Sequence, residues 1–225
     1  KIHPVLGSQG YKDVASLIPK LISGWQSDLT MMHGIVDDLN SFNDQPFMAY
    51  IVTSSTHFPY DTTTNLEMKY EKEILAQYPQ APKQIRSYLS KAMELDRAMA
   101  YLLDNLGSMD NTVIAMFGDH RPLNMPADYL INHSSVDRND AFGLDHTPMI
   151  IYTPNQTPEV VTKTSSTIDM APTIANMFNL KYDPRLFMGA DVFDNKNNTV
   201  VFQSGSWYDQ VGYFNIRNSK FTPFS

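Results

Sequence analysis

The chain has 225 residues, 42% of them hydrophobic, which predicts one domain with a substantial core. Its formal net charge of −7 and isoelectric point near 5.2 argue against a nucleic-acid-binding surface, which needs clustered Lys and Arg, and against broad attraction to anionic lipid. The absence of cysteine excludes disulfides and thiolate metal sites.

Residues 1–26 are interpreted as a boundary segment. Because the chain begins at Lys1 rather than Met, we expect it to be a fragment of a larger protein. Ser27 and Asp28 have the chemistry of a helix N-cap, and the apolar residues that follow recur at helical spacing. The sequence therefore predicts a helix over residues 29–42.

Three short apolar runs, rich in β-forming residues, predict buried strands of one sheet. They are Pro46–Thr53, Thr112–Phe117 and Met149–Thr153. An amphipathic pattern over residues 83–106 predicts a helix closed by Gly107. Because this helix connects the first two strands, we expect them to be parallel and joined by a right-handed crossover.

The carboxyl-terminal part continues the alternation of helices and strands. Residues 165–180 have helical spacing, and Thr167 and Asp169 are predicted to be capping residues. Residues 199–202 and 212–216 are expected to form edge strands. Strands that alternate with amphipathic helices favour an α/β fold.

Residues of the types that bind metal ions gather beside the three predicted strands. Asp119 and His120 follow the second strand. His57 follows the first strand, and His146 precedes the third. A carboxylate and a neutral imidazole can bind Zn or Mn, and open α/β sheets bind their ligands at strand ends. Two alternatives stay open: a surface Asp–His pair, and histidines satisfied by local hydrogen bonds.

Three common catalytic motifs are missing from the sequence: the G-x-S-x-G elbow, the P-loop and the G-x-G-x-x-G turn. Their absence argues against the commonest hydrolase and nucleotide-binding functions. Metal-assisted chemistry on an ester remains, with the ion as Lewis acid and imidazoles holding oxygens or moving protons. The polar stretches 61–82 and 121–144 are predicted to be long loops, and such loops often cover a site.

Further motifs follow one another in the order typical of a single enzyme family. They are PFMAYIVTSSTHFPY (Pro46–Tyr60), SKAMELDRAM (Ser90–Met99), DNTVIAMFGDH (Asp110–His120), DHTPMIIYTP (Asp145–Pro154), STIDMAPTIANMF (Ser166–Phe178) and YDPRLFMGADVF (Tyr182–Phe193). With these motifs the chain resembles the carboxyl-terminal part of the extracellular catalytic domain of lipoteichoic acid synthases and related phosphoglycerol transferases, in the alkaline phosphatase and sulfatase superfamily.

The resemblance implies a fold. We expect a three-layer αβα sandwich of the alkaline phosphatase/sulfatase type that lacks its amino-terminal part. Residues 1–225 would then be one partial catalytic domain, with residues 1–26 as a boundary segment and residues 194–225 as carboxyl-terminal edge strands.

The resemblance also implies roles for individual residues. Asp119 and His120 match the pair that binds a divalent ion, usually manganese, with Mg or Zn as alternatives. His57 matches the histidine that contacts the phosphoglycerol group. His146 and Arg121 are assigned to substrate binding, although His146 matches superfamily members more clearly than the synthases, and Arg121 stands where the family often has an aromatic residue.

The function implied is transfer of glycerol phosphate from a phosphatidylglycerol-type lipid to a polyglycerolphosphate or glycan acceptor. The nucleophilic threonine and an acidic metal ligand are expected upstream of Lys1, so no catalytic residue is assigned here and the fragment itself is expected to be inactive. We expect an anchor in the cell membrane through an absent amino-terminal segment, an extracellular catalytic domain, and self-association of the fragment. Alternatives are a sulfatase or phosphoethanolamine transferase on the same scaffold, and a non-catalytic anion-binding pseudoenzyme.

Overall fold

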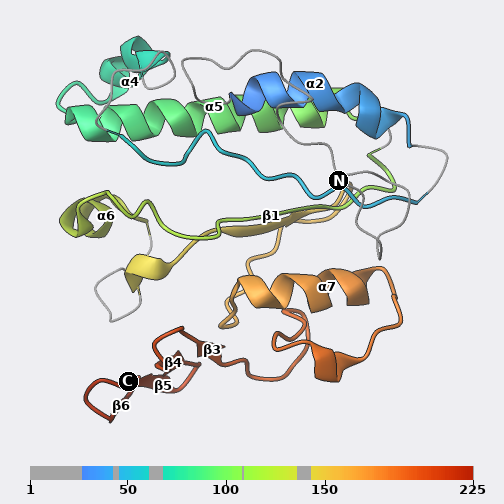
Figure 1. The fold of residues 1–225 in the computed structure, drawn as a ribbon, viewed down its shortest axis with the longest axis vertical. Helices are drawn as coiled ribbons and strands as arrows, with labels where there is room; N and C mark the ends of the chain where they lie inside the picture. Colours follow the sequence, from blue (N-terminus) through green and yellow to red (C-terminus); the bar gives the residue numbers. More distant parts are fainter. Residues whose placement is uncertain (1–26, 43–45, 61–67, 108, 136–142, 225) are drawn as a thin grey trace. The chain divides into compact units, whose positions relative to one another are not determined.

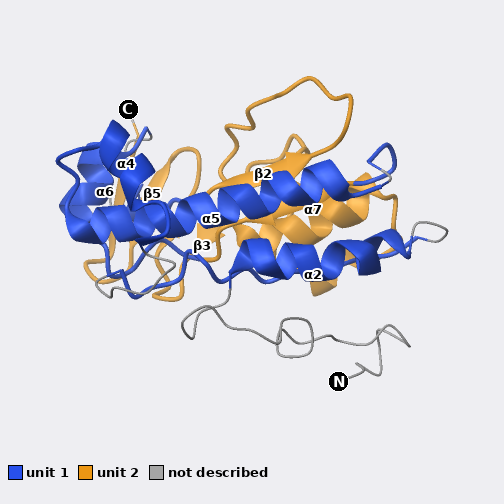
Figure 2. Ribbon diagram, turned by 90° about the horizontal axis from the view of Figure 1, so that it is seen from above, with its two compact units in different colours: residues 1–112, 120–146 blue, residues 113–119, 147–225 orange. Residues whose placement is uncertain are grey.

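The computed structural model describes residues 27–42, 46–60, 68–107, 109–135 and 143–224. The chain divides into two compact units (Figure 2). The first consists of Lys1–Thr112 and His120–His146, and the second of Val113–Asp119 and Thr147–Ser225. No helix within the described ranges is long and apolar enough to cross a membrane.

The first unit is helical, and its two longest described helices pack along each other (Figure 1). Met32 and Val36 on one helix, and Ala98 and Leu102 on the other, are buried and contribute to its apolar core. The helices are α2 (Asp28–Asn40), α4 (Glu71–Gln77), α5 (Lys83–Asn105) and α6 (Ala127–His133), with the 3-10 helix η1 (Gly143–Asp145).

Two predicted helices of this unit are confirmed to within two residues. The helix α2 begins after Ser27, whose side chain accepts a hydrogen bond from Thr30 N at 3.0 Å. The helix α5 ends where Leu106 N donates to Leu102 O at 2.9 Å, just before Gly107. The start of α2 could be predicted because it depends on the residue next to it in the sequence, whereas α5 ends at Leu106 in an extended conformation and not through a left-handed Gly107 cap.

The second unit contains two antiparallel sheets and the helix α7 (Met170–Met177), which follows the 3-10 helix η2 (Thr167–Asp169). In the smaller sheet Phe117 lies opposite Met149. The smaller sheet pairs β1 (Ile114–Phe117) with β2 (Met149–Tyr152), and the larger pairs, in order, β3 (Val200–Val201), β4 (Trp207–Tyr208), β5 (Gly212–Asn215) and β6 (Lys220–Pro223). A further 3-10 helix, η3 (Pro184–Leu186), follows α7.

The predicted capping role of Asp169 is confirmed in the 3-10 helix η2, which leads into α7, whereas the start of α7 itself has no side-chain cap hydrogen bond. Ser166 N donates to Asp169 Oδ2 at 2.7 Å in a capping box, so Ser166 rather than Thr167 is the partner residue. The other carboxylate oxygen of Asp169 accepts a hydrogen bond from Ala190 N at 2.7 Å. One side chain therefore both caps η2 and connects it to the segment around residue 190.

The prediction of a buried strand over residues 46–53 is wrong. In the described part of the chain this segment pairs with no strand, so the expected parallel crossover is absent, and β1 instead pairs antiparallel with β2. The side chains of Met48, Tyr50 and Val52 are exposed by 81%, 72% and 68%. An apolar run forms a strand only where a neighbouring strand satisfies its backbone groups, and the run itself does not identify that neighbour.

The remaining predictions of strands and loops are only partly confirmed. The positions of β3 and β5 match the two predicted edge strands, while β4 and β6 were missed. Each of the two stretches predicted as loops contains a helix, α4 or α6. The predicted strands at β1 and β2 do neighbour each other, but neither is buried: the residues of β1 are half-buried, and those of β2 alternate between half-buried and exposed. The three-layer sandwich stays a prediction.

Candidate active site

His57 lies in a turn of the first unit in which its backbone N donates to Ser54 O at 3.0 Å. Its exposed imidazole stacks on Phe58, with ring centroids 4.4 Å apart. The ring atom Nδ1 lies 2.8 Å from Phe58 O. Because a carbonyl oxygen only accepts hydrogen bonds, Nδ1 carries a proton, and in the neutral ring Nε2 carries the lone pair.

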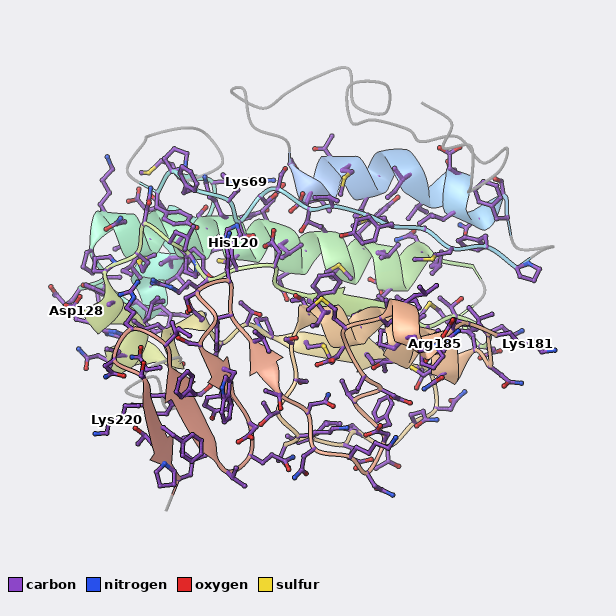
Figure 3. All side chains as sticks on the ribbon, turned by 60° about the horizontal axis from the view of Figure 1, so that its bottom comes forward. Lys69, His120, Asp128, Lys181, Arg185 and Lys220 are labelled. Atoms are coloured by element: carbon purple, nitrogen blue, oxygen red, sulfur yellow. The ribbon has the colours of Figure 1, made fainter. Side chains whose placement is uncertain are left out.

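His120 has the same arrangement on another segment of the same unit. Its Nδ1 lies 2.8 Å from Arg121 O, so this backbone carbonyl assigns the proton to Nδ1 and the lone pair of the neutral ring to Nε2. The rings of His57 and His120, the latter labelled in Figure 3, meet edge to face with centroids 6.2 Å apart. The structure therefore brings together two predicted site residues that are distant in sequence.

Asp119 directly precedes His120 in the chain but belongs to the second unit. There the neighbouring Gly118 N donates to Pro148 O at 3.0 Å, and a Cβ at Gly118 would lie 3.0 Å from Thr147 Cβ, so glycine suits this close approach. Asp119 and His120 are both exposed. Among the described residues no three acidic or histidine side chains gather as a metal site, so metal binding by this pair stays a prediction.

Arg121 and His146 are connected through Asp145, which sequence reasoning missed. Arg121 Nε donates to Asp145 Oδ1 at 3.0 Å. His146 is exposed, and its backbone N donates to Gly143 O at 3.3 Å at the end of η1. The ion pair holds Arg121 against the residue that precedes His146. Nothing in the sequence indicated that Asp145 would pair with Arg121. The substrate-binding roles of Arg121 and His146 stay predictions.

Asp28, the first residue of α2, supports the turn that carries His57. Its carboxylate oxygens accept hydrogen bonds from Ser54 N and Ser55 N, each at 2.9 Å, and Asp28 N donates to Ser55 Oγ at 2.9 Å. Burial raises the pKa of Asp28 above its usual value; the hydrogen bonds from Ser54 and Ser55 oppose this shift, and the nearby charge of Glu94 adds to it. The sequence indicated Asp28 only as part of a helix cap.

Glu94 on α5 is the centre of a second buried polar group. Its carboxylate accepts hydrogen bonds from Ser27 Oγ, from Lys69 Nζ at 2.7 Å and from Tyr70 OH at 2.6 Å. Burial opposes ionisation of Glu94, but the hydrogen bonds from Lys69, Ser27 and Tyr70 outweigh it and lower its pKa below the usual value. Because Ser27 also caps α2, this carboxylate links α5 to the start of the helix that supports the His57 turn.

Comparisons with known proteins find relatives of this chain over most of its length. The family model described as Sulfatase matches residues 4–180. The chain is 26% identical over 171 residues to lipoteichoic acid synthase 1 of Bacillus subtilis, covering 72% of this chain and 26% of that protein. It is 24% identical over 174 residues to lipoteichoic acid synthase 2 of B. subtilis, with coverages of 72% and 25%.

The lipoteichoic acid synthase of Staphylococcus aureus strain USA300 is 24% identical over 170 residues, with coverages of 72% of this chain and 25% of that protein. The chain thus spans about a quarter of the length of the curated relatives that it matches. Since the family model covers more than half of the 225 residues, the chain belongs to the sulfatase family.

Proposed function

We propose that this chain contributes to a phosphoglycerol transferase that moves glycerol phosphate from a phosphatidylglycerol-type lipid to a polyglycerolphosphate or glycan acceptor. The observation that carries the proposal is the pairing of His57 and His120 at 6.2 Å, each with Nδ1 bonded to a backbone carbonyl. In a sulfatase-family chain whose relatives are named lipoteichoic acid synthases, two oriented imidazoles suit a phosphate diester better than a neutral substrate.

In this proposal Asp119 and His120 hold a divalent metal ion, manganese in the first instance, with Mg or Zn as alternatives. The donors fit such an ion, because a carboxylate and an imidazole with its lone pair on Nε2 are ordinary ligands. When bound, the ion would offset negative charge on the phosphoryl oxygens, which a chain of net charge −7 otherwise repels.

The remaining residues bind and orient the substrate. His57 in its protonated form donates from Nε2 to a phosphoryl oxygen of the glycerol phosphate, while Nδ1 stays bonded to Phe58 O. Arg121 and His146 bind the head group or the acceptor, and the Asp145 carboxylate keeps the Arg121 guanidinium in place. The roles of Arg121 and His146 suit a polyanionic acceptor, because its phosphate groups need cationic or hydrogen-bonding partners in a chain that is otherwise acidic.

The nucleophile of the proposed reaction is a threonine outside these 225 residues. Its hydroxyl oxygen would attack phosphorus and release diacylglycerol, and the acceptor hydroxyl would then displace the threonine in a ping-pong course. The catalytic domain would face outward from a membrane-anchored protein. On this account the 225-residue chain alone is inactive and binds manganese weakly, because it supplies only part of the ligand set.

The test uses the gene product that contains these residues, incubated with manganese and phosphatidylglycerol in detergent, and measures the release of diacylglycerol. We expect His57→Gln and His120→Gln to lower the rate by about 10²-fold or more, as for lost acid–base or ligand groups. His33→Gln is the matched control, because His33 is exposed on α2 and stacks on Tyr101 with centroids 3.8 Å apart. Hydrolysis of p-nitrophenyl sulfate without release of diacylglycerol would instead support a sulfatase.

A further inference from the structure

We propose that Lys91 is a positioning residue for His57: its buried ammonium group fixes the backbone on both sides of the carbonyl that orients the His57 ring. The role of His57 in catalysis rests on the proposed function, but the effect of Lys91 on the ring does not. All the residues concerned belong to the first unit.

The contacts of Lys91 identify what it holds. Lys91 is fully buried, and its Nζ donates to His57 O at 2.9 Å and to Pro59 O at 2.8 Å. The residue between these two acceptors is Phe58, whose own carbonyl accepts the hydrogen bond from His57 Nδ1 at 2.8 Å. The peptide units on both sides of the one that contains the Phe58 carbonyl are therefore anchored, which fixes the direction of the carbonyl between them.

Burial of an ammonium group needs a compensating interaction, because an unpaired buried charge is very costly. Here the compensation includes the two carbonyl oxygens and the ring of Tyr60, whose centroid lies 5.6 Å from Lys91 Nζ. An apolar side chain on this face of α5 would fill the space without the free-energy cost of burying a charge. The geometry therefore assigns Lys91 the task of binding these carbonyls rather than merely packing the helix.

The other end of the turn is held independently. The Asp28 carboxylate accepts hydrogen bonds from Ser54 N and Ser55 N, while Lys91 donates to the carbonyls of His57 and Pro59. An anion thus binds the N–H groups at the start of the turn, and a cation binds the carbonyls at its end. Loss of the ammonium should leave the start of the turn in place and release only the part that orients the ring.

The consequence concerns the tautomer of His57. With Phe58 O in position, Nδ1 is the donor to the backbone, and the proposed contact with the phosphoryl oxygen is assigned to Nε2. Without Lys91 the Phe58 carbonyl can turn away, and both neutral tautomers become populated. A misplaced group of this kind lowers the rate of the chemical step more than it weakens binding of the substrate.

The experiment compares Lys91→Met with Lys163→Met in the gene product that contains this chain. Lys163 is a close chemical match from the second unit, because its Nζ donates to Asp191 O at 3.0 Å and Asp194 O at 3.1 Å and also contacts the Asp194 carboxylate. Both variants lose a lysine that binds two backbone carbonyls, fully buried in the case of Lys91 and 9% exposed at the side chain in the case of Lys163. Only Lys91 binds the turn that carries His57.

The first readout is the ¹⁵N spectrum of histidine-labelled protein at alkaline pH, where imidazoles are neutral. In the unaltered protein and in Lys163→Met we expect His57 to show a protonated Nδ1 and an unprotonated Nε2. In Lys91→Met we expect the two nitrogen shifts to move toward each other. The second readout is kcat and KM for release of diacylglycerol: kcat should fall about tenfold to a hundredfold in Lys91→Met, with KM nearly unchanged.

An unchanged His57 tautomer in folded Lys91→Met, or an equal change in Lys163→Met, would overturn the proposal. If Lys91→Met lacks a cooperative unfolding transition, the same spectra of Lys91→Gln decide, because its shorter neutral side chain should also fail to hold both carbonyls. If the unaltered protein releases no diacylglycerol but the tautomer responds as expected, the proposed function fails and the positioning role of Lys91 stands.

Discussion

Replacement of Glu94 tests how strongly the buried polar group holds the first unit together. The side chain of Glu94 is 0% exposed and accepts hydrogen bonds from Ser27, Lys69 and Tyr70. Glu94→Ala removes all three hydrogen bonds and leaves three polar groups without this acceptor. Glu94→Gln keeps the shape, because its amide oxygen can accept from Lys69 and Tyr70 while its NH₂ donates to Ser27 Oγ.

The expected magnitudes follow from these contacts. Removal of one partner from a buried ion pair costs about 3–5 kcal/mol; because the Lys69 side chain is 36% exposed, Glu94→Ala should lower the free energy of unfolding by an amount at the lower end of this range, about 3–4 kcal/mol. Each charge-assisted hydrogen bond exceeds a neutral one by roughly 1 kcal/mol. Three such bonds are weakened in Glu94→Gln, and we expect a loss of about 1–3 kcal/mol, clearly smaller than for alanine.

The effect depends on pH in a defined direction. Because the folded pKa of Glu94 is lowered, its charge stabilises the fold above the unfolded pKa of 4.5, and this contribution is lost as the pH falls through the folded pKa. The difference between the unaltered protein and Glu94→Gln should therefore be largest near neutral pH and shrink in acid. Urea unfolding of the purified chain, followed by circular dichroism of the helices at several pH values, measures it.

The control for this experiment is Asp96→Gln, which changes an exposed acidic residue on the same helix. Its unfolding free energy should change by less than about 0.5 kcal/mol. The reasoning would be refuted if Glu94→Gln cost as much as Glu94→Ala, because the carboxylate charge would then contribute nothing. A difference between the unaltered protein and Glu94→Gln that grew in acid would equally contradict the assigned direction of the pKa shift.

Two further predictions concern one residue in each unit. Burial, with a smaller effect of the nearby Tyr88, raises the pKa of Tyr60 to about 12. The neutral hydroxyl of Tyr60 therefore stabilises the folded chain fully below pH 10, the usual pKa of tyrosine, and this stabilisation is lost as the pH rises through 12. Tyr60→Phe removes the hydrogen bond to Thr56 O and should lower the free energy of unfolding by about 0.5–1.5 kcal/mol at neutral pH. The difference in urea midpoint between the unaltered protein and Tyr60→Phe should become smaller at alkaline pH. Gly189→Ala would place a Cβ 2.1 Å from Ile168 O, so we expect a loss of about 1–3 kcal/mol in thermal unfolding, and an unchanged Tm would contradict this packing.

Sequence reasoning succeeded where a structural feature depends on neighbours in the chain. The cap of α2 by Ser27 and the role of Asp169 before α7 involve residues within four positions of each other. Such local hydrogen bonds leave a signature in residue type and spacing. The failure at residues 46–53 has the opposite cause, because a strand is defined by a partner that its own sequence does not name.

The helix α5 shows a subtler limit. Its apolar spacing correctly predicted a helix, but the residues that become most buried are largely polar or charged in its first half. They are Ser87, Ser90, Lys91, Glu94, Ala98 and Leu102. Prediction from hydrophobic periodicity assumes that the buried face of a helix is apolar. It therefore fails to identify a buried face whose charged groups are compensated by hydrogen bonds.

The same limit explains which parts of the candidate site could be predicted. His57 and His120 were identified because each follows an apolar run predicted to be a strand; the run before His57 forms no strand, but the structure still brings the two rings together. Lys91 and Asp28 were not identified as supporting residues, since a lysine in a helix and an aspartate after a cap are common on protein surfaces. Asp28 and Lys91 differ from such surface residues because they are buried and still have hydrogen-bond partners, which only the folded chain shows. The histidines of the candidate site could be predicted from residue type and position in the sequence, whereas the residues that hold their turn in place can be recognised only from the contacts of their buried charges.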